Sequence, residues 1–368
     1  MLRVLFAGVV FLHGIIHLMG FMKAFRLADL SQLQQDISRP IGVMWLLTAV
    51  LFLMSSGAFM MKREWWWILA APALVLSQIL IVLSWGDAKF GTIANVIVLV
   101  PSVVGFGFWN FNRMVDRELA SLLSVPPLEK KVLTSEMIGG VPPVVRKWLE
   151  RSNVVGKEIA GTVRLRQTGQ MRSEPDGKWM AVEADQWFIT GKPGFLWKAE
   201  VAAAPGISMV GRDKYVDGRG YLLIKALGWF AVADAKGVDV DQGTMLRYLA
   251  EICWFPAAAV SDYIRWREID SLSAEATMSY SGVTASGIFR FDSSGDFRGF
   301  EARRYYHRET GSTLEDWLVQ TEPDGYGEFE GVRVPVRSAA TWKLKDGDFT
   351  WYKLQITDIR YNRKESIR

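Results

Sequence analysis

The chain has 368 residues, of which 50% are hydrophobic, and a net charge of +4 at pH 7. That charge is too small to predict a nucleic-acid partner, and no block of like charge forms a basic arm. The single cysteine, Cys253, excludes an internal disulfide and any zinc or iron–sulfur site built from several cysteines.

Four long apolar segments fill the first third of the chain, and none has Asp, Glu, Lys or Arg in its middle. Each is close to the ~20 residues that an α-helix needs to cross a hydrocarbon layer of ~30 Å. Tryptophans lie near their ends, where amphipathic rings favour the level of the lipid headgroups. The segments are residues 2–22, 41–61, 65–85 and 91–111. We therefore predict a four-helix transmembrane domain over residues 1–112, with the lipid bilayer as its partner.

The charges beside these segments bear on the side of the membrane that the rest of the chain occupies. Four spans leave the N-terminus and the polar two-thirds on one side. That side has five Lys or Arg near the membrane and the other has four, and positive charge favours the cytoplasm. The prediction is a multi-pass protein of the cell (inner) membrane with its polar part on the cytoplasmic side.

Two histidines, His13 and His17, lie one helical turn apart on the same face of the first segment. Ionisable groups at this depth are costly and usually face a bundle interior or a polar cavity. The spacing lets both rings bind one metal ion, although it cannot supply both axial ligands of a haem. The alternative is that the rings hydrogen-bond to Ser77, Gln78 or Asn95 and hold the bundle together.

After residue 112 the sequence becomes rich in charges, aromatics and turns. Residues 113–158 are predicted as a helical linker, with one helix over 144–151. Residues 159–368 are predicted as an antiparallel β-rich soluble domain, because apolar and polar residues alternate between explicit turns. The turns are 175–177 (PDG), 217–220 (DGRG), 293–296 (SSGD), 323–325 (PDG) and 345–348 (KDGD).

One stretch of the β-rich part has helical periodicity. Residues 242–254 form the predicted helix, with Asp241 as its N-cap, Pro256 after its end, and Arg247 and Glu251 spaced i, i+4 on its polar face. An antiparallel sheet with one helix has to curl around that helix or leave a cavity. The predicted fold class is an α-helical membrane bundle plus α+β: four transmembrane helices, then a curled antiparallel sheet (a half-open barrel) with a covering helix.

No motif in the chain specifies a reaction. Segment 206–211 (GISMVG) misses the nucleophile elbow by one position, and no phosphate-binding loop is present. His307 lies among arginines and is interpreted as part of an exposed strand face. We assign no catalytic residue and no cofactor, and the prediction is a protein that is not an enzyme.

Large aromatic side chains are numerous in the β-rich part. Packing of a core explains them, and the alternative is that some line a cavity, because ligand pockets are mainly aromatic and aliphatic with few polar anchors. Beside a membrane, the natural ligand of such a cavity is a lipid, with an arginine meeting its headgroup. The predicted ligand-binding residues are Trp187, Trp197, Tyr248, Trp254, Phe255, Trp266, Arg212, Arg304 and Tyr305.

Several segments together resemble a family of bacterial proteins of unknown function. They are 141–149 (VPPVVRKWL), 193–197 (PGFLW), 212–220 (RDKYVDGRG), 247–251 (RYLAE) and 302–305 (ARRY), and the likeness covers about residues 134–362. Segments 325–335 (GYGEFEGVRVP) and 356–359 (ITDI) are similar to the late strands of lipoprotein-carrier domains. The second resemblance implies a half-open barrel that holds acyl chains outside the cytoplasm, opposite to the side that the charge count favours.

The resulting prediction is a membrane protein whose soluble domain binds a lipid or another apolar molecule at the membrane surface without catalysing a reaction. Two alternatives stay open. One is a membrane redox or metal protein that uses His13 and His17. The other is a structural or protein-interaction module, because an aromatic groove suits a protein partner as well as a lipid.

Overall fold

We analysed a computed structural model of the chain, which describes all residues except 1, 31–32, 125–129, 309–310 and 364–368. The chain forms two compact units. The first consists of Met1–Arg113 with Leu227–Trp229, and the second of Met114–Ala226 with Phe230–Arg368. Each unit is described by itself.

The first unit is helical. Four of its helices are long and apolar enough to cross a membrane, which confirms the four predicted apolar helices. The helices are α1 (Leu2–Ala24), α2 (Arg39–Met60), α3 (Trp66–Leu83), the short α4 (Trp85–Ala88) and α5 (Gly91–Leu123), whose last ten residues belong to the second unit. Helix α5 thus runs through the predicted start of the linker at residue 113.

Small residues let the first two helices of this unit pack closely. Gly20 lies directly against the Trp45 ring, and Gly42 lies against Ala24, so that a larger side chain at either glycine would collide with the neighbouring helix. Phe52 is fully buried between the helices. Close approach at small residues is the usual basis of helix association where both helices and solvent are apolar.

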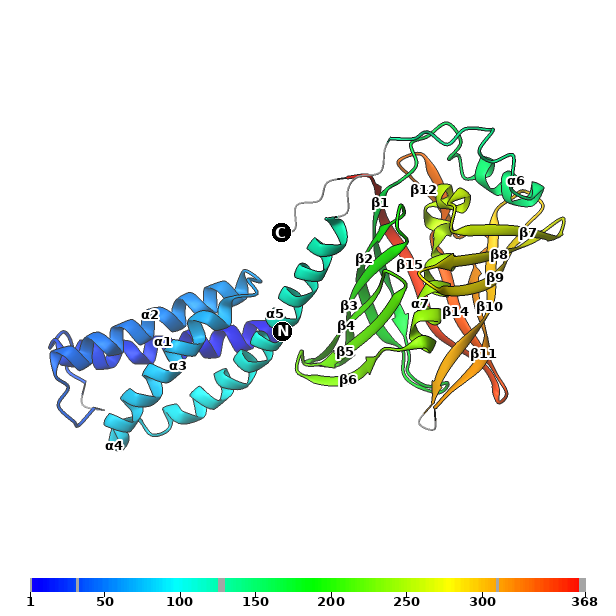
Figure 1. Cartoon of the computed structure of the whole chain (residues 1–368). Helices are drawn as coiled ribbons and strands as arrows, with labels where there is room; N and C mark the ends of the chain where they lie inside the picture. Colours follow the sequence, from blue (N-terminus) through cyan, green and yellow to red (C-terminus); the bar gives the residue numbers. More distant parts are fainter. Residues whose placement is uncertain (1, 31–32, 125–129, 309–310, 364–368) are drawn as a thin grey trace. The chain divides into compact units, whose positions relative to one another are not determined.

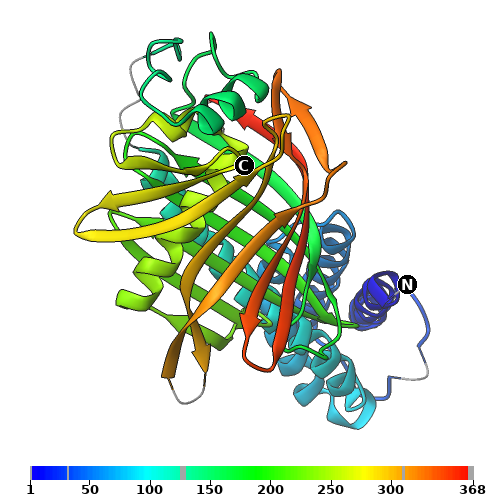
Figure 2. The same cartoon turned by 90° about the vertical axis from the view of Figure 1, so that its right-hand side faces the viewer.

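The second unit is built on one antiparallel sheet of 13 strands, which curls on itself (Figures 1 and 2). Its order is β6-β5-β4-β3-β2-β1-β15-β14-β11-β10-β9-β8-β7. The strands are β1 (Thr162–Met171), β2 (Met180–Ile189), β3 (Gly194–Ala204), β4 (Ile207–Val216), β5 (Arg219–Ala226), β6 (Phe230–Ala235), β7 (Ile264–Asp270), β8 (Ser273–Tyr280), β9 (Val283–Phe291), β10 (Phe297–Arg308), β11 (Gly311–Thr321), β14 (Arg337–Leu344) and β15 (Gly347–Tyr361). Strands β12 (Tyr326–Phe329) and β13 (Val332–Pro335) form a separate hairpin. The predicted antiparallel half-open barrel is confirmed.

The alternation of side chains separates a concave face from a convex face. On β1, Val163, Leu165 and Gln167 are buried on the concave face, whereas the basic residues between them are on the other face. Register shifts, such as the one at Arg166/Gln167 between β1 and β15, bend the strands. The period-two pattern therefore places each inward side chain as expected for a half-buried strand.

Helix α7 (Val238–Glu251) bridges the two arms of the curled sheet. It contacts β4 and β5 on one arm and β8, β9 and β10 on the other. It begins at Val238 with Gly237 as its N-cap, so the predicted N-cap role of Asp241 is wrong. The reason is a competing partner: the Asp241 carboxylate accepts hydrogen bonds from the backbone N–H of Gly220 at 2.7 Å and from Arg219 at 2.8 Å.

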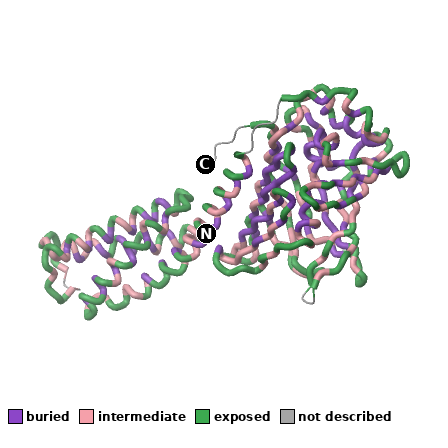
Figure 3. Tube along the Cα trace, in the orientation of Figure 1, coloured by how far each residue is buried: buried purple, intermediate pink, exposed green. Residues whose placement is uncertain are grey.

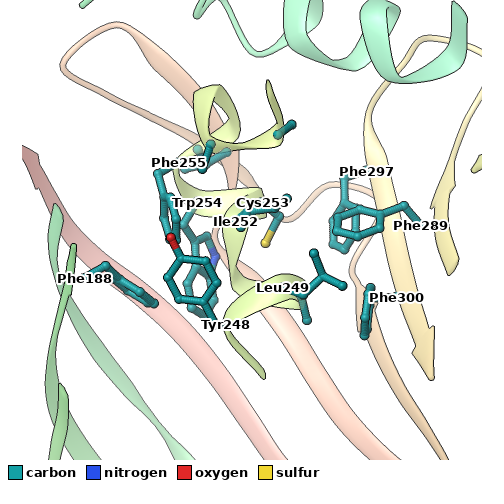
Figure 4. Packing of buried hydrophobic residues seen from close by; sticks show 14 of the residues in the cluster. Phe188, Tyr248, Leu249, Ile252, Cys253, Trp254, Phe255, Phe289, Phe297 and Phe300 are labelled. Carbon is teal, nitrogen blue, oxygen red and sulfur yellow. The ribbon is translucent and has the colours of Figure 1, made fainter. Parts of the chain in front are cut away.

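The core of the second unit surrounds the end of α7 and the two short 3-10 helices that follow, η1 (Ile252–Trp254) and η2 (Pro256–Val260). Figure 4 shows Tyr248 and Phe255 on the side of Phe188, and Leu249 on the side of Phe300. Helix α6 (Pro143–Arg151) forms where a helix was predicted over 144–151, and its apolar face is buried. Figure 3 shows the resulting band of buried residues along the inner side of the sheet.

Candidate functional site

A chain of buried polar side chains crosses the concave face beneath α7. Arg247 on α7 donates from Nη1 to Asp213 Oδ2 at 2.7 Å and from Nε to Glu251 Oε1 at 2.8 Å. Gln186 Nε2 donates to Glu251 Oε2 at 2.7 Å, and Gln167 Nε2 donates to Gln186 Oε1 at 2.8 Å. These bonds connect α7 to three strands of the sheet, so the predicted polar face of the helix points into the domain and not to solvent.

The charges in this chain are largely removed from water. Burial by itself lowers the pKa of the Arg247 guanidinium, but Glu251 and Asp213 outweigh that effect and hold the pKa above its usual value. Burial raises the pKa of the Glu251 carboxyl, and Arg247 opposes the change. Arg247 is therefore one buried cation shared between two carboxylates, Asp213 and Glu251.

Arg304 on β10 is the other arginine of the concave face. Its guanidinium carbon lies 4.6 Å from the ring centre of Trp317 and 5.7 Å from that of Trp342. The side chain also packs against Gly243 of α7, where an added Cβ would lie 3.1 Å from Arg304 Nε. Burial lowers the pKa of Arg304 to about 10, and the carboxylate of Asp213 only partly offsets the effect. A lowered pKa is typical of a cation without a nearby counter-ion.

Several buried polar atoms around these arginines have no hydrogen-bond partner among the described residues. They are the indole nitrogens of Trp197 and Trp317, Asp213 Oδ1 and Gln242 Oε1. Trp197 and Asp213 are directly opposite each other on β3 and β4, and Gln242 is next to Gly243 on α7. Buried polar atoms are nearly always satisfied in folded proteins, so these unsatisfied donors and acceptors indicate a place for water or a ligand.

A half-open pocket of about 240 Å³ lies in the same unit, beyond the C-terminal end of α7. Its floor is apolar and its rim is polar. The lining residues are Val154, Lys157, Glu158, Ala160, Phe255, Pro256, Ala257, Ala258, Glu330, Val332, Tyr361 and Asn362.

The predicted ligand-binding aromatics do not form one group. Trp197 is on the concave face, and its ring centre is 5.0 Å from the guanidinium of Arg247. Phe255 lines the pocket, whereas Tyr248 and Trp254 are buried in the core. Trp266 packs beside the core and donates from its indole nitrogen to the carbonyl of Ala259 at 2.8 Å.

The two arginines that sequence reasoning treated as equivalent lie on opposite faces of the sheet. Arg212 is fully buried on the convex face, where Glu118 of α5 lies 2.9 Å from its Nε and Tyr221 stacks on it. Of the two aromatics still to be placed, Trp187 is on the convex face and Tyr305 is 38% exposed. Arg304 is the arginine that shares the concave face with Asp213 and Arg247.

Sequence reasoning did not single out Gln167, Gln186 or Asp213 as members of the site. The sequence did contain a signal for them. Each of the three residues lies on the same face of its strand as a buried apolar residue nearby. Gln186 lies between Ala184 and Phe188 on the inward positions of β2. A polar residue at an inward position is the pattern that finds such a site.

The two histidines of α1 belong to a hydrogen-bonded cluster inside the first unit. His13 Nε2 lies 2.9 Å from Asn95 Oδ1, and His17 Nε2 lies 3.0 Å from Ser77 Oγ. His17 Nδ1 donates to the carbonyl oxygen of His13 at 2.8 Å. In the described part of the chain, no group of three or more His, Cys, Asp or Glu side chains is placed to hold a metal ion. The metal role of His13 and His17 stays a prediction.

Residues 131–354 match the profile of DUF6544, a family of unknown function, and the chain therefore belongs to that family. This confirms the resemblance expected from the sequence. A comparison with curated proteins finds no match.

Two solved structures are similar to the chain. A domain assigned to an outer membrane lipoprotein-sorting protein from Vibrio parahaemolyticus is 10% identical, with 56% of this chain and 88% of that chain covered and a TM-score of 0.30. A DUF1329 family protein from Desulfovibrio piger is 8% identical, with 62% and 95% covered and a TM-score of 0.35. The resemblance to lipoprotein-carrier domains expected from the sequence is thus also found.

Proposed function

We propose that the sheet domain of this DUF6544 member binds an apolar or amphipathic molecule of the lipid class in the pocket at Phe255–Ala258, and that it does so without catalysing a reaction. The pocket is the observation that carries the proposal. Ligand sites are concave and mostly apolar, with a few polar groups that set orientation. The same chain has four helices suited to crossing a membrane, and a membrane is a source of such molecules.

The floor of the pocket is open because its residues are small. Pro256 begins the short helix η2, and Ala257 and Ala258 follow on its buried side with little side-chain volume. Phe255 and Val332 add apolar surface from neighbouring elements. The free surface inside the pocket is therefore mainly hydrocarbon, which favours an apolar group over a polar one.

The polar groups of the rim are already engaged with one another. Lys157 Nζ donates to the carbonyl of Gly331, and Asn362 Nδ2 donates to Glu158 Oε1 at 3.1 Å. Asn362 Oδ1 accepts from the backbone N–H of Gly161 at 2.7 Å. A rim with satisfied hydrogen bonds can orient a ligand at the pocket mouth. The lining residues include no Ser, Cys or His that would serve as a nucleophile or general base.

In this proposal the domain lies on the cytoplasmic side, where the flanking charges favour it, and meets lipid at the membrane surface. The side can be tested separately from binding, because Cys253 is the single cysteine and is buried. A cysteine introduced at Lys89, in a connection between apolar helices, and another at Asp346, in a sheet turn, would report the two sides. A membrane-impermeant maleimide added to intact cells should label only the first.

Lipid binding is tested by native mass spectrometry and lipid extraction on the full-length protein from uncharged detergent micelles. We expect a stoichiometric lipid in the wild type. The change Ala257→Phe fills the pocket floor and should reduce the bound lipid at least tenfold. Ala181→Phe adds the same volume at an exposed position of β2 and is the matched control.

Both variants have to show cooperative thermal unfolding before their lipid content is compared. Loss of lipid in the Ala257 variant alone supports the pocket. Equal lipid in all three proteins, or a wild type that carries only lipid displaced by detergent exchange, would exclude the pocket as the binding site.

A further inference from the structure

Arg304 differs from Arg247 and Arg212, the two arginines described above, because it has no anionic partner among the described residues. Arg247 contacts two carboxylates, and Arg212 contacts Glu118. Among the described residues, none accepts a hydrogen bond from the Arg304 side chain or pairs with it. Glu315, directly opposite on β11, pairs instead with Arg308 at 3.0 Å.

The environment of Arg304 fixes the guanidinium without neutralising it. Trp317 and Trp342 stack on the side chain, and Gly243 of α7 allows the close approach of its Nε. Arg304 is half-buried, and none of its nitrogens is both enclosed and unsatisfied, so they stay open to the space at the concave face. A planar fork held by two aromatic rings, with free N–H groups, is the geometry that receives an oxyanion in a bidentate manner.

Unsatisfied buried atoms of the same face complete the set of groups a ligand needs. The indole N–H of Trp317 belongs to a ring that stacks on Arg304, and Trp317 is only 4% exposed. Gln242 Oε1, beside Gly243, is a free acceptor, while its amide nitrogen is held by the carbonyl of Arg303 at 2.9 Å. These atoms are independent of the arginine and indicate the same place, with donors for an oxyanion and an acceptor for a neighbouring hydroxyl.

The charge balance sets the number of charges that the ligand carries. Arg247 and Arg304 together match Asp213 and Glu251, so the face is neutral when it is empty. A doubly charged ligand would be repelled by the two carboxylates, whereas a singly charged one is opposed much less. A phosphodiester and a carboxylate are the common singly charged oxyanions at neutral pH.

We propose that Arg304, with Trp317 and Gln242, forms a binding site for a singly charged oxyanion, either a phosphodiester or a carboxylate. In this assignment the anion is either carried by a lipid or is a free small molecule, and the shared chemistry is the oxyanion itself. The site goes beyond the pocket at Phe255–Ala258. Gly243 lies within α7, about 12 Å along the helix axis before its last residue, Glu251, and Ala257 lies beyond that end, in η2.

The test is calorimetric titration of the full-length protein in uncharged detergent micelles. The probes are dihexanoyl phosphatidylglycerol, hexanoate, acetate and inorganic phosphate, with hexanol as the uncharged control. Binding of the first two alone identifies a lipid source, and binding of acetate with equal strength identifies a free anion. Inorganic phosphate, which is partly doubly charged at neutral pH, should bind more weakly than acetate. Hexanol should not bind at this site.

Arg304→Gln should weaken binding of the best probe at least tenfold, and Arg304→Lys should recover part of it because the charge returns without the fork. Arg303→Gln is the matched control, since Arg303 is the neighbouring residue on the opposite face and pairs with Asp316 at 3.3 Å. It should bind as the wild type does. Trp317→Phe keeps an aromatic ring, removes the indole N–H and should weaken binding severalfold.

The Trp317 variant keeps the test decisive if Arg304→Gln does not fold. The proposal is overturned if no anionic probe binds the wild type, or if Arg304→Gln and Trp317→Phe both bind with wild-type affinity. Ala257→Phe should leave anion binding unchanged, so failure of the pocket and failure of the oxyanion site are distinguishable.

Discussion

Removal of the Arg247 charge is the most direct test of the buried polar chain. The change Arg247→Gln leaves Asp213 and Glu251 on the concave face without their shared cation, at contacts that were 2.7 and 2.8 Å. Breaking a buried ion pair from one side typically costs about 3–5 kcal/mol. For a domain of this size we expect the unfolding temperature to fall by about 10 °C.

The loss should depend on pH in a defined direction. Burial raises the pKa of Glu251 above its ordinary value of 4.5, so the folded state favours the protonated acid and loses stability as the pH rises above that value. Without Arg247 the pKa of Glu251 rises further, because an opposing cation has been removed. The difference between variant and wild type should therefore be smaller at pH 5 than at pH 8.

The assay is thermal unfolding of the full-length protein in detergent, followed by circular dichroism of the sheet signal at both pH values. Arg303→Gln removes an exposed arginine and should change stability by less than about 1 kcal/mol. Adding Glu251→Gln to the Arg247 variant should restore part of the stability. A shift equal to that of the Arg303 control, or one independent of pH, refutes the reasoning.

Three further predictions concern other parts of the chain. Cys253 is fully buried, and burial raises the pKa of its thiol, so it should react with maleimide in the native protein at least ~100-fold more slowly than after unfolding. Gly287→Ala should destabilise the sheet by about 1–3 kcal/mol in denaturant titration, because its Cβ would overlap the ring of Phe300. The double change His13→Ala and His17→Ala should lower the thermal stability of the helical unit; elemental analysis that finds a stoichiometric metal in the wild type and none in the variant would instead establish the metal alternative.

The parts of the fold that could be predicted are those with a local signal. Uninterrupted apolar runs specify the four helices, and Asp-Gly turns between alternating segments specify the antiparallel sheet. The pairing of β1 with β15 has no such signal, because Val163 and Tyr361 are opposite each other although almost 200 residues separate them along the chain. That pairing follows from how the whole sheet closes, which depends on bulges and on the helix inside it.

The candidate site was predictable to a similar extent. Strand alternation places Arg304 on the same face as the buried Phe300, and Arg212 on the face opposite to the buried Tyr215. No comparable rule predicts which face of α7 turns toward the sheet. The i, i+4 pair Arg247 and Glu251 is typical of a solvent-exposed helix face, and only the curl of the sheet around α7 puts that face in contact with Gln186 and Asp213.

The contrast between the two concave arginines leads to a last prediction, made in the absence of ligand. The lowered pKa means that keeping the Arg304 charge in the folded protein costs stability, part of which stacking on Trp317 offsets. The sign is opposite to that of Arg247: a cation with a depressed pKa lowers stability at neutral pH, and the penalty disappears only as the pH rises above about 10. Arg304→Gln should therefore unfold at the same temperature as the wild type or a few degrees higher at pH 7. A cation that costs stability and is nevertheless held in place by two tryptophans is explained by a ligand, whereas destabilisation as large as that of Arg247→Gln would show that Arg304 serves the fold.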